Sequence, residues 1–340
     1  MKFHLPTLLI VFAATIILAS CSNHKKDIKP VSLHGKAQGT YYTIIYYDSL
    51  QRNFQPQIDS LLDAFDKSVS LWVNNSVISR VNRNDTSVKL DSNFIGNFKY
   101  SQLVSKETKG AFDMTVGPLV EVWGFGFENR ENVTPKIVDS LLKIVGYKKI
   151  KIINGKVIKA DSRMQIDFNA IAQGYSDDVV GDFLQTKGIR NYLVDIGGEV
   201  KAKGHKVNGP WRVGVEKPAV DKTSQREVEI AVALKDKSLA TSGNYRKYYV
   251  KNGKRYAHTI NPHTGYPVQH SLLSASVLAD NTALADAYAT AFMVMGFRKS
   301  KEFVLNHPGL EAFFIYSGKN GKFKTYATPG FKKIILKRVN

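Results

Sequence analysis

A segment between residues 281 and 296 constrains the fold of this chain more than any other feature. Its composition, rich in alanine and other apolar residues, predicts a helix that starts at Asn281 or Thr282 and stops at Gly296. Asp286 and Thr290 lie four residues apart and therefore share one face of this otherwise apolar helix. A buried carboxylate is costly unless it is paired or bound to a metal. Carboxylate and hydroxyl oxygens suit Mg²⁺, whereas an ion pair between Asp286 and one of the many lysines is the alternative.

Residues 257–268 hold two imidazoles in a segment whose prolines and glycine predict a rigid turn. Asn252-Gly253 predicts a hairpin turn, so His258 lies at the far end of a hairpin, where Arg246 would come near it across the pair. Loops at strand ends often carry catalytic groups. A histidine titrates near neutral pH and suits proton transfer from a hydroxyl, while a purely structural histidine is the alternative for His258 and for His263.

Two further segments have the composition of ligand-binding loops. Glycines and aromatic residues are dense in 110–126, which suggests a wall for a flat ligand, although a buried aromatic turn has the same composition. In 164–175 a strand ends near Asp167, and a helix is expected from Ala170 to about Lys187. The N terminus of that helix offers free N–H groups to a pyrophosphate; alternatively, Asp167 is only its N-cap. No Gly-x-Gly-x-x-Gly motif opens a helix here, so a Rossmann fold is unsupported.

The rest of the chain alternates between helical and strand patterns. The spacing of apolar residues predicts helices over 57–65, 94–108 and 134–146. Runs of β-branched and aromatic residues predict strands over 41–47, 192–200, 211–216 and 227–234. Hairpins are expected at 150–159 and 311–326, each around an Asn-Gly turn, together with a small-residue turn at 240–243 and a basic, strand-like tail.

The N terminus has the composition of an export signal. Residues 8–19 are almost wholly apolar but too few for a membrane span, and they end in Leu-Ala-Ser-Cys, which resembles the bacterial lipobox. Cys21 is the only cysteine, so it has no disulfide partner. We expect a lipoprotein signal peptide over 1–20, a lipid on Cys21 and a solvated tether over 21–34; an ordinary secretory signal with an incidental cysteine is the alternative. The mature chain would then be anchored in the bacterial cell envelope, facing the periplasm, with the inner membrane favoured over the outer.

Composition favours a folded domain with a strongly positive charge. Hydrophobic residues make up 43% of the chain, which argues against disorder. The 48 basic and 29 acidic side chains leave a net charge of +19. Because the lysines are dispersed and an exported protein seldom meets nucleic acid, we expect no nucleic-acid partner. An anionic ligand is the favoured partner, with the membrane surface as a second attraction.

Five motifs stand in order along the chain. They are 112–119 (Phe-Asp-Met-Thr-Val-Gly-Pro-Leu) with 123–126 (Trp-Gly-Phe-Gly), 167–175 (Asp-Phe-Asn-Ala-Ile-Ala-Gln-Gly-Tyr), 242–245 (Ser-Gly-Asn-Tyr), 258–265 (His-Thr-Ile-Asn-Pro-His-Thr-Gly), and 285–291, with Ala-Asp-Ala at its start and Thr-Ala at its end. Together with the lipobox they resemble the ApbE family, the FAD:protein FMN transferases. The resemblance runs from about Gly35 to the last hairpin.

This resemblance implies a single domain over 35–340 with an α+β, two-lobed fold, mixed and antiparallel sheets, and a nucleotide cleft between the lobes. Enzymes of this family split the pyrophosphate of FAD with Mg²⁺, release AMP and attach FMN by a phosphoester to a Thr or Ser hydroxyl of an exported acceptor protein. Phosphoryl transfer needs mainly positioning and charge neutralisation, so a metal and a nearby base suffice. The alternatives are an FAD pyrophosphatase that yields FMN and AMP, and a non-catalytic FAD-binding lipoprotein.

The resemblance also implies roles for individual residues. His258 would be the base that takes the proton of the acceptor hydroxyl, and His263 would only sit in the turn. Mg²⁺ would be held by the Asp286 carboxylate, the Thr290 hydroxyl and the Ala170 carbonyl, with Ala289 nearby. FAD would contact Gln38, Leu71, Trp72, Val73, Ala111, Phe112, Asp113, Asp167, Gln173 and Ile260. The chain departs from the family pattern at Gln173, which bears on nucleotide affinity, and at Asn261, which bears on the turn.

Overall fold

The computed structural model describes residues 28–125, 133–218, 227–244, 248–251, 254–318 and 322–338. The predicted signal peptide, Cys21, Arg246 and the Asn252-Gly253 turn lie outside the described residues. The first strand begins at Pro30, within the segment expected to be the tether. In the described part of the chain, no helix is long and apolar enough to cross a membrane.

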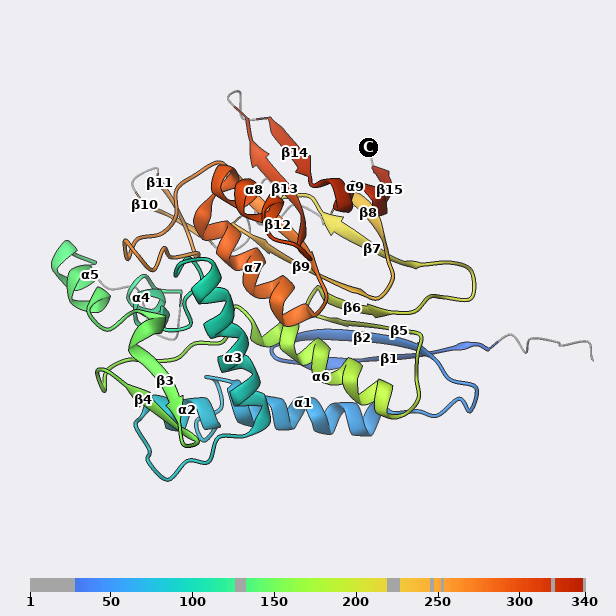
Figure 1. Cartoon of the computed structure of the whole chain (residues 1–340), viewed down its shortest axis with the longest axis horizontal. Coiled ribbons are helices and arrows are strands. Elements are labelled where there is room, and N and C mark those ends of the chain that lie inside the picture. Colours follow the sequence, from blue (N-terminus) through green and yellow to red (C-terminus); the bar gives the residue numbers. More distant parts are fainter. Residues whose placement is uncertain are drawn as a thin grey trace, which may run out of the picture.

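One sheet of eight strands organises the molecule (Figure 1). Each strand runs antiparallel to its neighbours. From edge to edge the order is β1 (Pro30–Ala37), β2 (Thr40–Tyr47), β5 (Tyr192–Ile196), β6 (Glu199–Lys203), β9 (Lys237–Gly243), β12 (Leu272–Ala279), β13 (Glu311–Ser317) and β14 (Phe323–Ala327).

Helices cover one face of this sheet (Figure 1). Helices α1 (Gln55–Val69) and α6 (Ala172–Thr186) pack through apolar side chains onto β1, β2 and β5. Helix α7 (Thr282–Met295) lies on β9 and β12, and it also contacts α6, α3 (Ser92–Glu107) and α8 (Phe297–Leu305). The alanines of α7 are fully buried, because only small side chains let the sheet and the neighbouring helices approach it this closely. The predicted helix with Asn281 as its N-cap and Gly296 as its stop is confirmed.

A second layer covers the opposite face of the sheet. It consists of β7 (Trp211–Glu216), β8 (Val228–Leu234) and β15 (Ile335–Arg338), preceded by α9 (Pro329–Ile334). Trp211, Phe313 and Phe331 anchor the apolar core between the two layers. The strand-like tail predicted from the sequence is right only for β15, because Pro329 and Phe331 start a short helix that packs against β13 and β8 before the last strand begins.

Short elements gather at one end of the molecule (Figure 1). They are α2 (Val77–Asn82), α4 (Gly117–Val122), α5 (Pro135–Leu142), η1 (Tyr147–Lys149), β3 (Ile150–Ile153) and β4 (Lys156–Lys159). The β3–β4 hairpin confirms the predicted Asn-Gly turn: Asn154 and Gly155 both have positive φ, at 48° and 73°. A second hairpin, β10 (Tyr248–Lys251) and β11 (Lys254–Ala257), ends one residue before His258, as the sequence predicts.

The small-residue turn predicted at 240–243 is wrong. These residues belong to β9, a central strand paired with both β6 and β12. Ala240 is fully buried in the core cluster that contains α7, so small side chains are required there by the helix that crosses the strand. The fold class itself is confirmed, since the molecule is a mixed α/β protein built on antiparallel sheets.

Candidate active site

The first turn of α6 and the first half of α7 meet at Gly174. Gly174 donates its N–H to Asp286 Oδ2 at 3.3 Å, across 112 residues of sequence. A Cβ on Gly174 would lie 2.4 Å from the Thr282 carbonyl oxygen and 2.9 Å from Asp286 Cβ, so no larger residue fits there. Asp286 is only 7% exposed. The predicted helix-terminus site and the predicted metal-binding helix therefore lie side by side.

Contacts between polar side chains lead from α7 to His258. Thr290, one turn after Asp286, has its Oγ1 3.1 Å from Ser242 Oγ on β9. Just beyond this strand, Asn244 Oδ1 accepts a hydrogen bond from Thr259 Oγ1 at 2.8 Å. Because Thr259 directly follows His258, the predicted base is tied to the end of the strand that contacts Thr290.

The loop that carries His258 is held against α4 by Trp123. Trp123 Nε1 donates to the Gly265 carbonyl at 2.8 Å. Ile260 is buried in the apolar cluster that includes Trp123 and Leu119. Inside the loop, Gly265 N donates to the Asn261 carbonyl at 2.8 Å, which closes the turn expected from the sequence. Ile260 therefore has a packing role in the loop, and its predicted contact with FAD remains a prediction.

The two histidines occupy different surroundings. His258 is partly buried, and its ring centroid lies 6.4 Å from that of Phe125 in an edge-on arrangement. His263 is exposed, and its Cε1 lies 3.1 Å from where a Cβ on Gly110 would be. His263 thus borders the 110–113 loop, whereas His258 lies at the end of the β10–β11 hairpin.

Ala111, Phe112 and Asp113 are buried, as the buried-turn alternative requires. Asp113 Oδ1 accepts hydrogen bonds from Thr115 N at 2.8 Å and from Thr115 Oγ1 at 2.6 Å, and its Oδ2 accepts one from Tyr147 N at 2.7 Å. The carboxylate therefore fixes its own loop to the start of η1. Contact of these three residues with a flavin remains a prediction.

Asp167 borders the same loop but does not cap α6. Its N–H donates to the Met114 carbonyl at 2.7 Å, and its Oδ1 accepts from Asn169 N at 2.7 Å. The helix begins at Ala172 rather than at Ala170, and its cap residue makes no side-chain cap hydrogen bond. The N-cap alternative for Asp167 is thus wrong, and Ala170 lies in the turn that leads into the helix.

Gln38 approaches the first turn of α6 from the sheet side, and Gln173 belongs to that turn. Gln38 stands in the β1–β2 turn, where its φ of 53° lies in the left-handed region. Its Oε1 accepts from Ser176 Oγ at 3.3 Å, while its buried Nε2 has no partner among the described residues. Gln173 Nε2 lies 2.4 Å from where a Cβ on Gly197 would be, so the amide rests on the glycine backbone of the β5–β6 turn. Both amides lie at the α6 terminus, and their contact with FAD remains a prediction.

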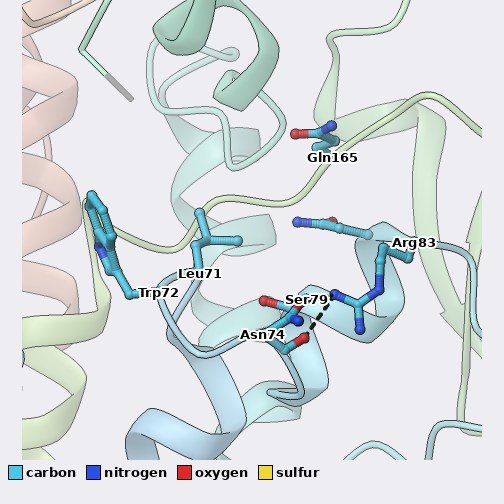
Figure 2. Close-up of a pocket in the computed structure, with 7 residues that line it drawn as sticks. Leu71, Trp72, Asn74, Ser79, Arg83 and Gln165 are labelled. Atoms are coloured by element: carbon cyan, nitrogen blue, oxygen red, sulfur yellow. Dashed lines mark hydrogen bonds between the residues drawn. The ribbon is translucent and has the colours of Figure 1, made fainter. Parts of the chain in front are cut away.

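An open cavity of about 400 Å³ lies between the end of α1 and the segment before Asp167 (Figure 2). Trp72, 72% exposed, and Leu71 line its rim. Asn82, the last residue of α2, connects this helix to the segment before Asp167. Its Oδ1 accepts a hydrogen bond from Ile166 N at 2.8 Å, and its Nδ2 donates one to the Ile166 carbonyl at 2.9 Å. The other lining residues are Asn74, Ser79, Arg83 and Gln165; Val73 is not among them.

A group of buried acids beside Asp286 was not predicted. Asp177, on the inner face of α6, is fully buried, and neither of its carboxylate oxygens has a hydrogen-bond partner among the described residues. Burial and the carboxylate of Glu199 raise the pKa of Asp177 well above its usual value. Burial and the carboxylate of Asp286 do the same for Glu199. The spacing of Gly174, Asp177 and Gly181 on one helical face is the sequence signal that could have identified an inward-facing Asp177.

The donor groups at this site fit a hard divalent cation. Burial raises the pKa of Asp286 to about 7, because one hydrogen bond from Gly174 N is the only one found for its carboxylate in the described part of the chain. A bound cation would offset this cost. The predicted set has one carboxylate, one hydroxyl and one carbonyl. It is not a group of three His, Cys, Asp or Glu side chains, and no such group that could hold a metal ion is found among the described residues. Ala289 is fully buried and offers no side-chain oxygen.

Comparison with known proteins agrees with the fold and the motifs. The model of the ApbE family matches residues 38–314. The FAD:protein FMN transferase of Haemophilus influenzae is 36% identical over 96% of this chain and 96% of its own length, and that of Vibrio cholerae is 35% identical over 97% and 99%. Among solved structures, the flavin transferase ApbE of Vibrio cholerae superposes with a TM-score of 0.78 at 34% identity, covering 90% of this chain and 99% of its own. The apo flavinyl transferase ApbE of Pseudomonas stutzeri superposes with a TM-score of 0.80 at 30% identity, covering 92% and 98%.

The family model spans the α6–α7 contact, the 258–268 loop and most of the large sheet, and the relatives align over nearly the full length of the chain. The predicted membership of a transferase enzyme family is therefore confirmed. This chain belongs to the ApbE family, whose relatives named above are flavin transferases.

Proposed function

We propose that this chain is an Mg²⁺-dependent FAD:protein FMN transferase, which moves FMN from FAD to a Thr or Ser hydroxyl of an exported acceptor protein and releases AMP. The observation that carries the proposal is the contact between Asp286 and the first turn of α6 at Gly174. A helix N terminus attracts phosphate groups, and a carboxylate beside it attracts the cation that phosphates bring. The names of the full-length relatives support the same activity.

Separate groups of residues would bind the metal ion and the nucleotide. Mg²⁺, held by the Asp286 carboxylate, the Thr290 hydroxyl and the Ala170 carbonyl, would neutralise negative charge on the pyrophosphate. Gln38 and Gln173 hold the nucleotide near the α6 terminus. The exposed indole of Trp72 offers a flat surface against which a ring of FAD can stack.

The transfer step replaces the phosphoanhydride bond of the pyrophosphate by a phosphoester bond. The acceptor hydroxyl oxygen forms a bond to the phosphorus of the FMN half, and the bond from that phosphorus to the bridging pyrophosphate oxygen breaks. The electron pair of the broken bond stays on the phosphate of AMP. His258 takes the proton of the hydroxyl, because a neutral imidazole is a base of suitable strength near pH 7.

The activity is tested by incubating the purified chain with FAD, Mg²⁺ and an exported flavoprotein. We expect a fluorescent acceptor band on a denaturing gel and one AMP released for each flavin attached. If FAD is split but no protein fluoresces, the chain is a pyrophosphatase; if FAD stays intact with Mg²⁺ present, the chain only binds FAD. Asp286→Asn should abolish the Mg²⁺-dependent reaction, and Asp182→Asn is the matched control, because Asp182 lies on α6 with its side chain 71% exposed.

The predicted anchor completes the proposal: a lipid on Cys21 would attach the chain to an envelope membrane, facing the periplasm, where exported acceptors lie. Mass spectrometry of the mature N terminus should find a lipid-modified cysteine as the first residue. In a Cys21→Ala variant, the protein should no longer fractionate with membranes. A mature N terminus without a lipid would contradict the proposed anchor but not the proposed transferase activity.

A further inference from the structure

One end of the molecule contains the point where the chain enters the sheet. It lies opposite the end that carries α2, α4 and α5 (Figure 1). We define this entry face by the start of β1 and four loops that hydrogen bonds join to one another: residues 28–30, 48–53, 187–191, 203–209 and 235–236.

Hydrogen bonds make the entry face a continuous surface. They run from Gln51 Nε2 to the Lys29 carbonyl (2.9 Å), from an Arg52 guanidinium nitrogen to the Lys187 carbonyl (2.9 Å), from His205 N to Asn191 Oδ1 (3.0 Å) and from Gly204 N to Asp236 Oδ1 (3.0 Å). Gly204 has a φ of 60°, and a Cβ there would lie 2.1 Å from Asn191 Oδ1. The loops therefore keep a fixed relation to one another.

The entry face carries an excess of basic side chains. Its two carboxylates are both in ion pairs, Asp48 with Arg52 at 2.7 Å and Asp236 with Lys203 at 3.4 Å. Five further cations lie on the face, and in the described part of the chain none of them is within ion-pair distance of an acid: Lys29, Lys187, Arg190, Lys206 and Lys235.

Two aliphatic side chains project among these cations. Leu50, in the loop after β2, is 71% exposed, and Val207, in the loop after β6, is 56% exposed. Both loops flank Asn191, because Tyr47 N donates to the Asn191 carbonyl and His205 N to its side chain. Exposed aliphatic side chains surrounded by basic ones suit the interface of a bilayer. There the basic side chains bind lipid phosphates, and the aliphatic side chains insert between the headgroups.

We propose that the entry face docks on the anionic lipid headgroups of the membrane that holds the chain. The proposal rests on the lipid anchor proposed at Cys21. The segment from Cys21 to Pro30 spans at most about 30 Å when fully extended, so the face that includes Lys29 is the part of the domain kept next to the bilayer. Each basic side chain near an anionic surface is attracted to it, and five such side chains on one face orient the domain.

Docking through this face directs the candidate active site away from the lipid. Helix α6 runs from the contact with Asp286 at its first turn to the entry face at Lys187, just after its last. Its 15 residues span about 22 Å. The site would thus open toward acceptor proteins rather than toward the bilayer.

The test uses the mature full-length chain in vesicles of phosphatidylcholine alone or with about 30% phosphatidylglycerol, at low salt. Lysines are acetylated briefly and quantified by mass spectrometry. We expect acetylation of Lys29, Lys187, Lys206 and Lys235 to fall about threefold or more in the anionic vesicles and to recover at about 0.5 M NaCl, where screening shortens the electrostatic range. Lys136, Lys143 and Lys148, at the opposite end, should react equally in both kinds of vesicle. Equal acetylation of the entry-face lysines in both, or protection of all lysines alike, would overturn the proposal.

Two triple variants with the same change in net charge separate this face from the overall charge of the protein. Lys187→Glu, Arg190→Glu and Lys206→Glu together should abolish the protection of Lys29 and Lys235. Lys136→Glu, Lys143→Glu and Lys148→Glu together should leave it intact. If both variants lose protection alike, the attraction comes from net charge and the entry face has no special role.

Failure of the anchor gives a different result. Without a lipid, the chain does not float with phosphatidylcholine vesicles, yet salt-sensitive flotation with anionic vesicles still reports on the entry face. Covalent flavin transfer is measured separately, in detergent, so loss of that activity is distinguished from loss of docking.

Discussion

At the scale of single residues, the two histidines of the 258–268 loop give opposite expectations. His258→Ala should lower the rate of flavin transfer by about 10²- to 10⁴-fold, because the acceptor hydroxyl loses its base, while FAD affinity changes little. His263→Ala should transfer at a near-normal rate, since His263 is exposed and borders the 110–113 loop rather than the end of the β10–β11 hairpin. Initial rates of in-gel flavin fluorescence and a titration of FAD binding check both expectations. Loss of transfer in His263→Ala with activity kept in His258→Ala would reverse the assignment.

The residues that connect His258 to α7 could be predicted only in part from the sequence. Local composition identified Asp286, Thr290 and His258 one by one. Their relation depends on the contact of Thr290 with Ser242 and on the bond between Asn244 and Thr259, and these form only once β9 has paired with β12. Side chains that meet through sheet pairing leave no periodic signal in a single sequence.

At the scale of elements, Asp178 on α6 determines where α7 begins. Its Oδ1 accepts from Thr282 N at 3.0 Å and its Oδ2 from Ala283 N at 2.9 Å, while Lys201 Nζ lies 2.7 Å from Oδ1. The negative charge lies at the positive end of the α7 dipole, and β6 supplies the balancing cation. Asp178 therefore joins the sheet, α6 and the helix that carries Asp286.

Asp178→Asn should destabilise the protein by about 1 to 3 kcal/mol, because Lys201 loses its partner and an amide has only one acceptor oxygen for the N–H groups of Thr282 and Ala283. It should also weaken Mg²⁺ binding several-fold without touching the ion, since α7 shifts relative to Gly174. Urea unfolding gives the first quantity and isothermal titration with Mg²⁺ the second. Asp182→Asn, which removes an exposed carboxylate 3.9 Å from the same Lys201, should change neither; equal effects of the two variants would refute a positioning role for Asp178.

Elements with strong local signals were predicted well, and those defined by their neighbours were not. The helix at 281–296 is bounded by its own capping residues, and the hairpin at 150–159 by its own Asn-Gly turn. Both elements are confirmed. The 240–243 segment has the composition of a turn but is a strand, because α7 crosses it closely and excludes larger side chains. Propensity gives way to packing wherever a helix lies directly on a strand.

At the scale of the whole molecule, the order of strands could not be predicted from the sequence. β9 pairs with β6 and β12 in the large sheet, whereas the last strand, β15, pairs with β8 in the second layer. Strand order depends on which apolar faces bury each other across the molecule, and local patterns do not encode it. One consequence of this assembly is that Asp177, Glu199 and Asp286, from α6, β6 and α7, are buried together.

This group of acids makes the stability of the metal-free protein depend on pH. Burial raises the pKa of Asp286 to about 7, and burial together with a neighbouring carboxylate raises the pKa values of Asp177 and Glu199. In the unfolded chain these groups titrate near pH 4. Between about pH 4 and pH 7 the folded state keeps protons on these carboxyl groups that the unfolded state has released. The free energy of unfolding therefore falls as pH rises.

The midpoint of urea unfolding without Mg²⁺ should therefore decrease from pH 5 to pH 8, by an amount equivalent to about 2 kcal/mol. Asp177→Asn keeps the shape of the side chain and removes one titrating group, so it should flatten this decrease and raise stability at pH 8. Asp139→Asn, which removes an exposed carboxylate on α5, should keep the wild-type slope. Millimolar Mg²⁺ should restore part of the stability at pH 8 by binding the ionised Asp286. A midpoint that rises with pH, or that Asp177→Asn leaves unchanged, would mean that the buried acids are ionised and paired with a cation in the folded state.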